Sequence, residues 1–222
     1  MINGGLLRDA VISAAHSISN KKKSVDELNV FPVPDGDTGT NMSMTITNSV
    51  AELENLSDDT GCSVVASTTA SALLRGARGN SGVILSLIFR GFAKGLAGKK
   101  EMGANELVES LEQGVSGAYT SVMKPTEGTI LTVARESAEK AREMLHSTND
   151  PIIIMEEVCK QAELSLNETP KLLPALAKAG VVDAGGKGLC VIFEGMLSVI
   201  KNGIMIEADD DTAPATVSTF ES

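Results

Sequence analysis

Hydrophobic residues recur at intervals of three and four along most of the chain, which is the spacing of one face of an α-helix. In the first such stretch they run from Leu6 to Ile18 and end at the Lys21–Lys23 cluster. Asp150 before Pro151 and Thr169 before Pro170 are typical signals for the start of a helix. The pattern predicts further helices over residues 42–53, 63–75, 83–92, 106–123, 129–145, 151–166, 170–176 and 189–200.

These segments predict an all-α fold of about eight helices with almost no strand. The chain has no Trp, one Tyr and five Phe, although 42% of its residues are hydrophobic, so its core must be aliphatic. A length of 222 residues suits one domain, which we expect over residues 1–203. Residues 204–222 begin with Ile204–Ile206, which is compatible with a short strand. They then become acidic and rich in Thr, Ser and Ala, as in a linker or tail.

The stretch Asn29–Met42 carries the most distinctive chemistry. Pro32 and Pro34 fix their own φ angles and favour an extended backbone, so the chain enters a turn as a rigid segment. Asp35 and Asp37 follow, separated by a single glycine that lets the backbone bend sharply. Their carboxylates are therefore expected to converge on one point.

A helix is expected to start directly after this turn, with Thr38 or Thr40 as its N-cap. Its free backbone N–H groups would then lie beside two carboxylates. Mg²⁺ binds through one or two carboxylates plus substrate phosphates, and helix N-termini accept phosphate oxygens. The stretch fits a metal and phosphate loop, but a turn that does no more than cap a helix uses the same residue types.

Three further polar segments precede predicted helices. Gly79–Gly82 offers free N–H groups and the Ser81 hydroxyl beside the charged Arg78, which fits a second phosphate site or a close helix crossing. The other two segments fit contacts to the nucleotide, or simple helix caps. They contain Thr126, Gly128 and Thr129 in one case, and Asp183 and Gly185 in the other.

Composition narrows the partners and the location. The formal net charge of −10 argues against nucleic acid as a partner, because binding to its phosphates needs a basic face. Three widely separated cysteines imply buried thiols in a reducing compartment rather than a disulfide framework. The longest apolar run, from Val83 to Phe89, is too short to span a bilayer. We therefore expect a cytoplasmic protein without a membrane span.

Several familiar sites are excluded by their spacing. No glycine–lysine pair is followed by Ser or Thr, no Gly-x-Gly-x-x-Gly follows a predicted strand, and no Gly-x-Ser-x-Gly occurs. His16 and His146 lie in predicted helices and suit surface or interface positions better than catalysis. Phosphoryl transfer tolerates such sparse acid–base chemistry, because it depends mainly on positioning and on neutralisation of charge by metal ions.

Four motifs, in this order, resemble the nucleotide-binding domain of bacterial fatty acid kinases. That domain belongs to the DhaL class, the ATP-binding subunit of dihydroxyacetone kinases, also labelled the Dak phosphatase domain. The match reaches about Gly203, nearly the whole chain. The motifs are Asn29–Met42, Ala77–Ile84, Lys124–Ile130 and Val181–Gly186.

The resemblance implies antiparallel helices in an up-and-down barrel, with ATP and two Mg²⁺ ions at one rim. It implies that Asp35 and Asp37 ligate the metal. Dihydroxyacetone kinases carry a third metal-binding aspartate ahead of this pair. In the corresponding region this chain has Asn29, whose side-chain carbonyl oxygen is the candidate third metal ligand. With the glycine-rich segments, the candidate nucleotide-binding residues are Thr38, Gly39, Thr40, Asn41, Gly79, Asn80, Ser81, Gly82, Thr126, Gly128, Thr129, Asp183 and Gly185.

Chains of the fatty acid kinase family are much longer than this one, and the resemblance implies that their later domains engage a DegV-type protein that presents the fatty acid. The hypothesis is an ATP-dependent phosphotransferase domain that phosphorylates a fatty acid carboxylate, with Asp35, Asp37 and Arg78 as catalytic residues. The alternatives are dihydroxyacetone held on a partner subunit as the acceptor, a metal-dependent phosphatase, and a scaffold without activity. Whether the chain forms a homodimer stays open, as does turnover by this domain alone.

Overall fold

The computed structural model describes residues 1–209, which fold as helices with no strand. Eight of the ten helices in this range have ten or more residues, as the hydrophobic spacing predicts. The tail expected beyond residue 209 lies outside the described residues. The helices are α1 (Gly4–Asp26), α2 (Thr38–Thr47), α3 (Val50–Glu54), α4 (Cys62–Gly76), α5 (Gly79–Gly95), α6 (Ala104–Ser121), α7 (Ile130–Met144), α8 (Pro151–Leu172), α9 (Pro174–Ala179) and α10 (Ala184–Asn202).

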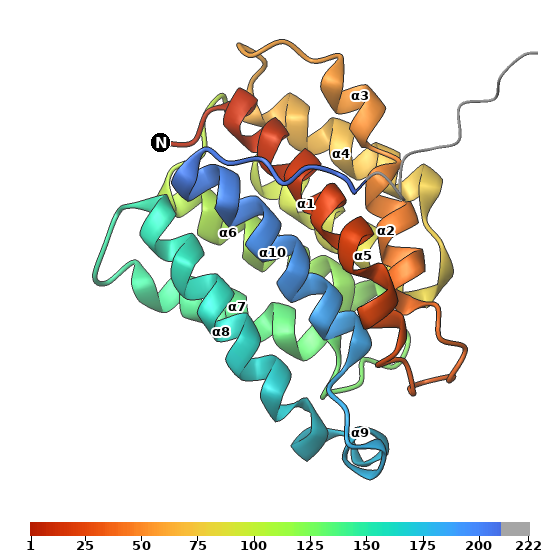
Figure 1. Ribbon diagram of the computed structural model, residues 1–222. Helices are drawn as coiled ribbons and strands as arrows, with labels where there is room; N and C mark the ends of the chain where they lie inside the picture. Colours follow the sequence, from red (N-terminus) through yellow and green to blue (C-terminus); the bar gives the residue numbers. More distant parts are fainter. Residues whose placement is uncertain (210–222) are drawn as a thin grey trace, which may run out of the picture.

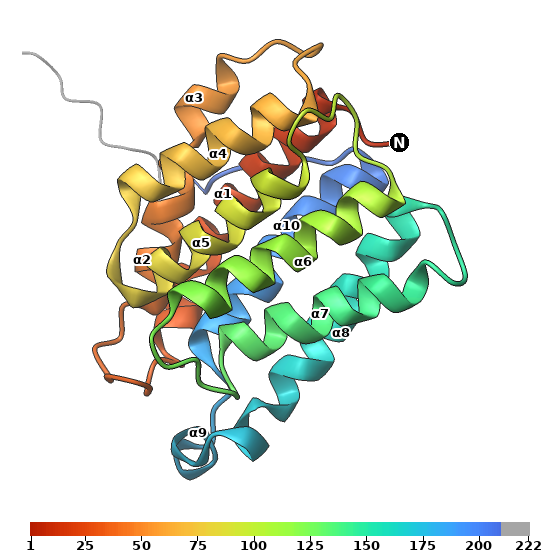
Figure 2. The same ribbon diagram turned by 180° about the vertical axis from the view of Figure 1, so that it is seen from behind.

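The long helices alternate in direction and surround a common core (Figures 1 and 2). Helices α2, α5, α7 and α10 begin at the same end of the molecule, where α1, α4, α6 and α8 finish. We call this end the rim and define it by the connecting segments 27–37, 77–78, 122–129 and 180–183. All four motifs of the sequence therefore lie at one end of an antiparallel helical barrel.

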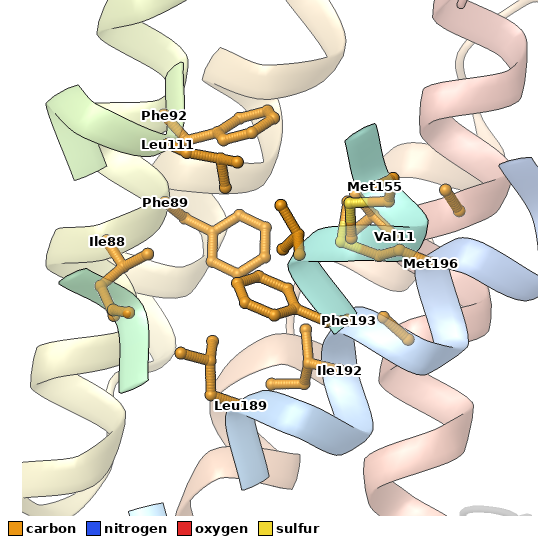
Figure 3. Close-up of a cluster of buried hydrophobic side chains, with 14 of the residues drawn as sticks. Val11, Ile88, Phe89, Phe92, Leu111, Met155, Leu189, Ile192, Phe193 and Met196 are labelled. Carbon is orange, nitrogen blue, oxygen red and sulfur yellow. The ribbon is translucent and has the colours of Figure 1, made fainter. Parts of the chain in front are cut away.

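Side chains fill the interior of the barrel (Figure 3). Phe89 from α5 and Phe193 from α10 meet near its centre, and Met155 and Met196 lie beside them. A cavity of about 30 Å³ remains among these apolar side chains, which is room for about one water molecule. The core is aliphatic apart from these few Phe rings, as the composition implies.

The first and last long helices close the barrel. A Cβ added at Gly195 of α10 would lie 2.8 Å from the Cα of Ala14, so only a glycine lets α10 approach the α1 backbone this closely. The buried Ser13 hydroxyl donates to the Gly195 carbonyl at 2.8 Å. This contact joins parts of the chain that are about 180 residues apart in sequence.

Residues 204–209 fold back along α1 towards the rim, and we call them the strap (Figure 1). Backbone groups of the strap bond to polar side chains of α1: Ile206 to Ser13 and to His16, and Glu207 and Asp209 to Asn20. A helix has no backbone groups left to pair with an extended segment, so side chains spaced along its outer face take over that role. His16 is thus an interface residue.

Three local expectations were wrong. The short strand considered for Ile204–Ile206 does not form. The helix predicted over 42–53 is interrupted, because Ser49 donates its hydroxyl to the Ile46 carbonyl and Asn48 donates to Ala72 of α4. A helix does not start at Pro170. Instead α8 continues through it. Proline has no N–H to donate to the Leu166 carbonyl, and Thr169 Oγ1 donates to that carbonyl in its place, at 2.6 Å.

Other expectations were confirmed. Asp150 caps α8 by accepting from the Ile152 amide, and Pro151 is its first residue. The three cysteines are buried and unpaired, and burial raises the pKa of the Cys62 thiol to about 11, so it stays a thiol. Over residues 1–209, every helix is too short or too polar to cross a membrane.

Candidate functional site: the rim of the barrel

Asn29 shapes the loop that carries the two aspartates. Its buried side chain donates to the Val33 carbonyl at 3.0 Å, and its oxygen accepts from the amide of Asp37 at 3.1 Å. The same oxygen accepts from the amide and the hydroxyl of Thr38, at 3.2 and 2.8 Å. Asn29 therefore acts as a remote cap for α2, and the oxygen offered above as a third metal ligand is occupied by three hydrogen bonds.

Asp35 and Asp37 lie on either side of Gly36, whose φ of +67° produces the turn expected from the sequence. Asp35 is exposed and Asp37 half-buried. Neither carboxylate has a hydrogen bond or an ion pair to any described residue. Asp37, rather than Thr38 or Thr40, is the N-cap of α2, although its side chain makes no capping bond. Both carboxylates are therefore available to ligate a cation.

These two carboxylates fit Mg²⁺ better than a site built entirely from protein ligands. Within residues 1–209, no group of three or more His, Cys, Asp or Glu side chains is placed to hold a metal. Mg²⁺ keeps several of its waters and binds through one or two carboxylates together with substrate phosphates. A carboxylate pair at a phosphate-accepting helix start has that donor set, so the residues present fit the ion.

Asp26, at the end of α1, is a residue of this region that sequence reasoning missed. Its carboxylate accepts from the Thr40 amide at 2.9 Å and from the Thr40 hydroxyl at 2.7 Å. The Thr38 hydroxyl donates to Asn29, so neither Thr38 nor Thr40 has a hydroxyl free to donate to a phosphate. No local pattern links positions 26 and 40, because they meet only where α1 and α2 pack together.

The start of α5 lies against α2. Gly79 has a φ of +60°, and a Cβ added to it would lie 2.4 Å from the side-chain nitrogen of Asn41, so this position requires glycine. The Arg78 amide donates to Thr45 Oγ1 at 3.1 Å, and Ser81 Oγ donates to the Thr38 carbonyl at 3.5 Å. Asn80 is exposed directly beside them. The structure thus brings the Asp35–Asp37 loop and the Gly79–Gly82 segment together.

The start of α10 packs between α2 and α7. A Cβ on Gly188 would overlap the Met42 sulfur at 2.5 Å, and one on Gly185 would lie 3.3 Å from Ile130. Asp183 caps α10, accepting from the Gly186 amide at 2.8 Å. Burial raises the pKa of Asp183 to about 6, although hydrogen bonds from the Gly186 and Ile130 amides oppose the shift. Asp183 is therefore a buried anchor of the rim.

The segment before α7 is held by its own polar network. Gly128, with a φ of +83°, donates its amide to Thr132 Oγ1 at 2.8 Å, and Thr129 is the N-cap of α7. The Thr129 hydroxyl donates to the Thr126 carbonyl at 2.6 Å. Thr126 and Thr129 therefore serve as turn and cap residues, and their hydroxyls are engaged within the segment.

Glu127 ties this segment to α6 and α7. Its carboxylate accepts from Tyr119 at 2.9 Å, from Thr132 at 2.5 Å and from Arg135 at 3.0 Å. Burial alone would raise the pKa of Glu127, but hydrogen bonds from Thr132, Arg135 and Tyr119 outweigh it and lower that pKa. The partners of Glu127 come from two different helices, so no local sequence pattern indicates its role.

Unpaired cations gather at the rim. Most lysines and arginines in the described part of the chain form ion pairs, but Arg78 does not, and neither do four lysines at this end. A chain with a net charge of −10 has many carboxylates to pair with them. Cations left without partners favour an anionic ligand here. The four lysines are Lys22, Lys23, Lys124 and Lys178.

An antiparallel barrel with four helix starts and two unpaired carboxylates at one rim matches a known class. Residues 32–198 match the DAK2 domain, so the chain belongs to the DAK2 domain family. It is 49% identical over 201 residues to Protein YloV of Bacillus subtilis, and 50% identical over 208 residues to an uncharacterized protein of Staphylococcus haemolyticus. These matches cover 90% and 93% of this chain, but 36% and 37% of the relatives.

Solved structures share the fold. The chain superposes on the dihydroxyacetone kinase from C. freundii in complex with AMP-PNP and Mg²⁺, with a TM-score of 0.63 and 16% identity. The match covers 87% of this chain and 33% of that one. The native form of the same kinase gives a TM-score of 0.61. The all-helical barrel expected from the sequence is therefore confirmed as the fold of this family.

Proposed function

We propose that the rim binds ATP with magnesium, and that the domain is the nucleotide-binding part of a phosphotransferase. The observation that carries this proposal is that the unpaired Asp35 and Asp37 directly precede α2, whose Thr38 and Asn41 contact the Gly79–Gly82 helix start. The solved relative bound to AMP-PNP and Mg²⁺ supports the choice of ligand. Membership of the DAK2 family supports the choice of chemistry.

Asp35 and Asp37 would hold Mg²⁺, which supplies charge neutralisation at the phosphates when bound. The start of α5, where Gly79 and Asn80 are exposed, would orient the phosphates through backbone N–H groups. Arg78, with no carboxylate partner, would offset the negative charge of the transferred group. Asp26 and Asn29 position the loop and do not touch the nucleotide.

We further propose a fatty acid carboxylate, presented by a separate DegV-type protein, as the acceptor. Neither histidine is available at the rim as a general base, because His16 is bonded to the strap and His146 follows α7 at the opposite end. Asp183 is buried, and the carboxylates of Asp35 and Asp37 are assigned to the metal. A carboxylate acceptor needs none, since it is already ionised at neutral pH. An alcohol acceptor such as dihydroxyacetone has to lose a proton.

Calorimetric titration with AMP-PNP tests the nucleotide site. The parent should bind it with Mg²⁺, and Asp35→Ala should weaken that binding at least tenfold. Glu101→Ala is the matched control, because Glu101 is an exposed carboxylate at the opposite end of the barrel. Equal binding by the parent and Asp35→Ala would show that the loop does not hold the metal.

Labelled ATP tests the acceptor. The chain and the longer Bacillus subtilis relative would each be offered a fatty acid on its carrier protein, dihydroxyacetone on a partner subunit, and simple phosphate esters. Acyl phosphate, trapped as a hydroxamate, is the expected product. Label in dihydroxyacetone phosphate would replace the fatty acid with the ketone. Release of inorganic phosphate from esters without ATP would indicate a phosphatase.

A further inference from the structure

A hollow of about 540 Å³ is lined by residues of α4, of the second half of α5 and of α6. Figure 2 shows α5 lying between α4 and α6. We call it the α5 groove. Arg90 and Lys94 of α5 line it, with Gln113, Ser116 and Thr120 on α6 and Ser67 on α4. None of these residues belongs to the rim. Arg90 comes eleven residues after Gly79, which places it about 16 Å further along the helix.

The cations of the groove have no partners. Arg90 and Lys94 are exposed and form no ion pair or side-chain hydrogen bond with any described residue. They are one turn apart on the same face of α5, where like charges repel each other. On α6, the carboxylates of Glu109 and Glu112 are engaged by Arg142 instead. In a chain of net charge −10, this pair is a local excess of positive charge.

The shape of the groove follows from glycine. A Cβ added to Gly91 would lie 2.1 Å from the Gln113 carbonyl oxygen, so α5 and α6 touch backbone to backbone. Small residues on both helices leave the space above this contact unfilled. Its volume falls in the range of about 300–1,000 Å³ for small-molecule sites, whereas a protein partner usually covers about 800 Å² per side.

We propose that the α5 groove is a second anion site, which binds a small organic molecule carrying phosphate groups. Arg90 can donate two parallel hydrogen bonds to one phosphate, and Lys94 adds a compact charge one turn away. The exposed hydroxyls of Ser116 and Thr120 supply further donors. This proposal does not depend on the function proposed for the rim.

Calorimetry with inorganic pyrophosphate, in EDTA so that no metal is present, tests the site. Arg90→Gln with Lys94→Gln should weaken binding at least tenfold. Lys160→Gln with Lys171→Gln is the matched control, since it removes the same charge from exposed lysines that pair with glutamates on α8. All four positions are exposed, so each variant should fold, and circular dichroism checks this. Equal affinity in the parent and both double variants would overturn the proposal.

Two further arms locate and identify the ligand. If Arg78→Gln weakens pyrophosphate binding tenfold while Arg90→Gln with Lys94→Gln does not, the binding belongs to the rim and the proposal fails. Hexaglutamate should bind at least tenfold more weakly than pyrophosphate. If hexaglutamate binds more tightly and depends on Arg90 and Lys94, the groove receives an acidic protein segment, and the proposal fails.

Discussion

At the scale of single residues, the loop depends on Asn29. Replacing it with alanine leaves the amides of Asp37 and Thr38 without their acceptor at the start of α2. We expect Asn29→Ala to lower the free energy of unfolding by about 2 kcal/mol, because it removes a cap and its cross-loop bonds. Urea unfolding in EDTA measures this loss without any contribution from a metal.

Asp35→Ala is the natural comparison for Asn29→Ala. Since its carboxylate has no partner among the described residues, its loss should change stability in EDTA by less than about 0.5 kcal/mol. The two variants therefore separate a residue that builds the loop from one that we propose to bind the metal. Equal stability of Asn29→Ala and the parent would contradict the capping role.

Asp183 predicts a pH dependence. Its folded pKa of about 6 lies above the ordinary value of 3.8, so the folded state binds the proton more tightly than the unfolded state. Its contribution to stability is therefore most favourable below about pH 4, declines as pH rises and is fully unfavourable above about pH 6. Asp183→Asn should remove this penalty, gaining on the order of 2 kcal/mol over the parent at pH 7.5.

Thermal unfolding of the parent and Asp183→Asn, at pH 4.5 and pH 7.5, measures the effect. The asparagine keeps an oxygen for the Gly186 amide, so the cap of α10 should survive. A stability difference that is the same at both pH values would show that Asp183 does not titrate in this range.

The sequence was informative about the site wherever neighbouring residues carry the chemistry. The turn at Gly36 between Asp35 and Asp37 follows from local backbone rules and could be predicted. The partner of Thr40 could not, because Asp26 reaches it across a helix pair. The role of Asn29 was equally hidden, since an amide oxygen can ligate or cap, and only the folded loop decides between them.

At the scale of elements, the prediction succeeded where a helix has a polar start and an apolar face. The starts of α7, α8 and α10 carry a Thr or Asp cap whose side chain accepts from the helix backbone. It failed where side chains redirect backbone hydrogen bonds, as Ser49 does after α2 and Thr169 does before Pro170. Those hydrogen bonds depend on side-chain rotamers, which the spacing of hydrophobic residues does not predict.

Two glycines at the α5–α6 contact make a matched test of this packing. A Cβ on Gly91 would lie 2.1 Å from the Gln113 carbonyl oxygen, whereas one on Gly117 would meet nothing closer than 3.6 Å. Gly91→Ala should therefore destabilise the protein by at least about 2 kcal/mol, through forced separation of the helices. Gly117→Ala should be neutral or stabilising by up to about 1 kcal/mol, because alanine favours the helix.

Chemical denaturation of the two glycine variants decides the point. Similar losses in both would mean that the helices adjust freely, and that the close contact of backbones does not set their spacing. Neither substitution changes charge, so the comparison isolates packing.

At the scale of the whole molecule, the barrel is closed by its two ends. The contact of α1 with α10 completes the core. The barrel therefore needs both the N-terminal and the C-terminal helices of residues 1–203 in order to close. This long-range closure also places Gly188 of α10 against Met42, at the end of the Asn29–Met42 motif. Hydrophobic spacing predicts the helices but not their neighbours, and here the resemblance of the four motifs supplied the arrangement.

The strap packs against this closed unit. It was expected to belong to the linker, yet Ser13, His16 and Asn20 all bond to its backbone. A chain ending at Asp209 should therefore unfold at the same temperature as the full chain. One ending at Gly203 should unfold a few degrees lower, since about 1 kcal/mol corresponds to roughly 2–4 °C at this size. Equal melting temperatures for the two shortened chains would place the strap outside the folded unit, and the boundary would return to residue 203.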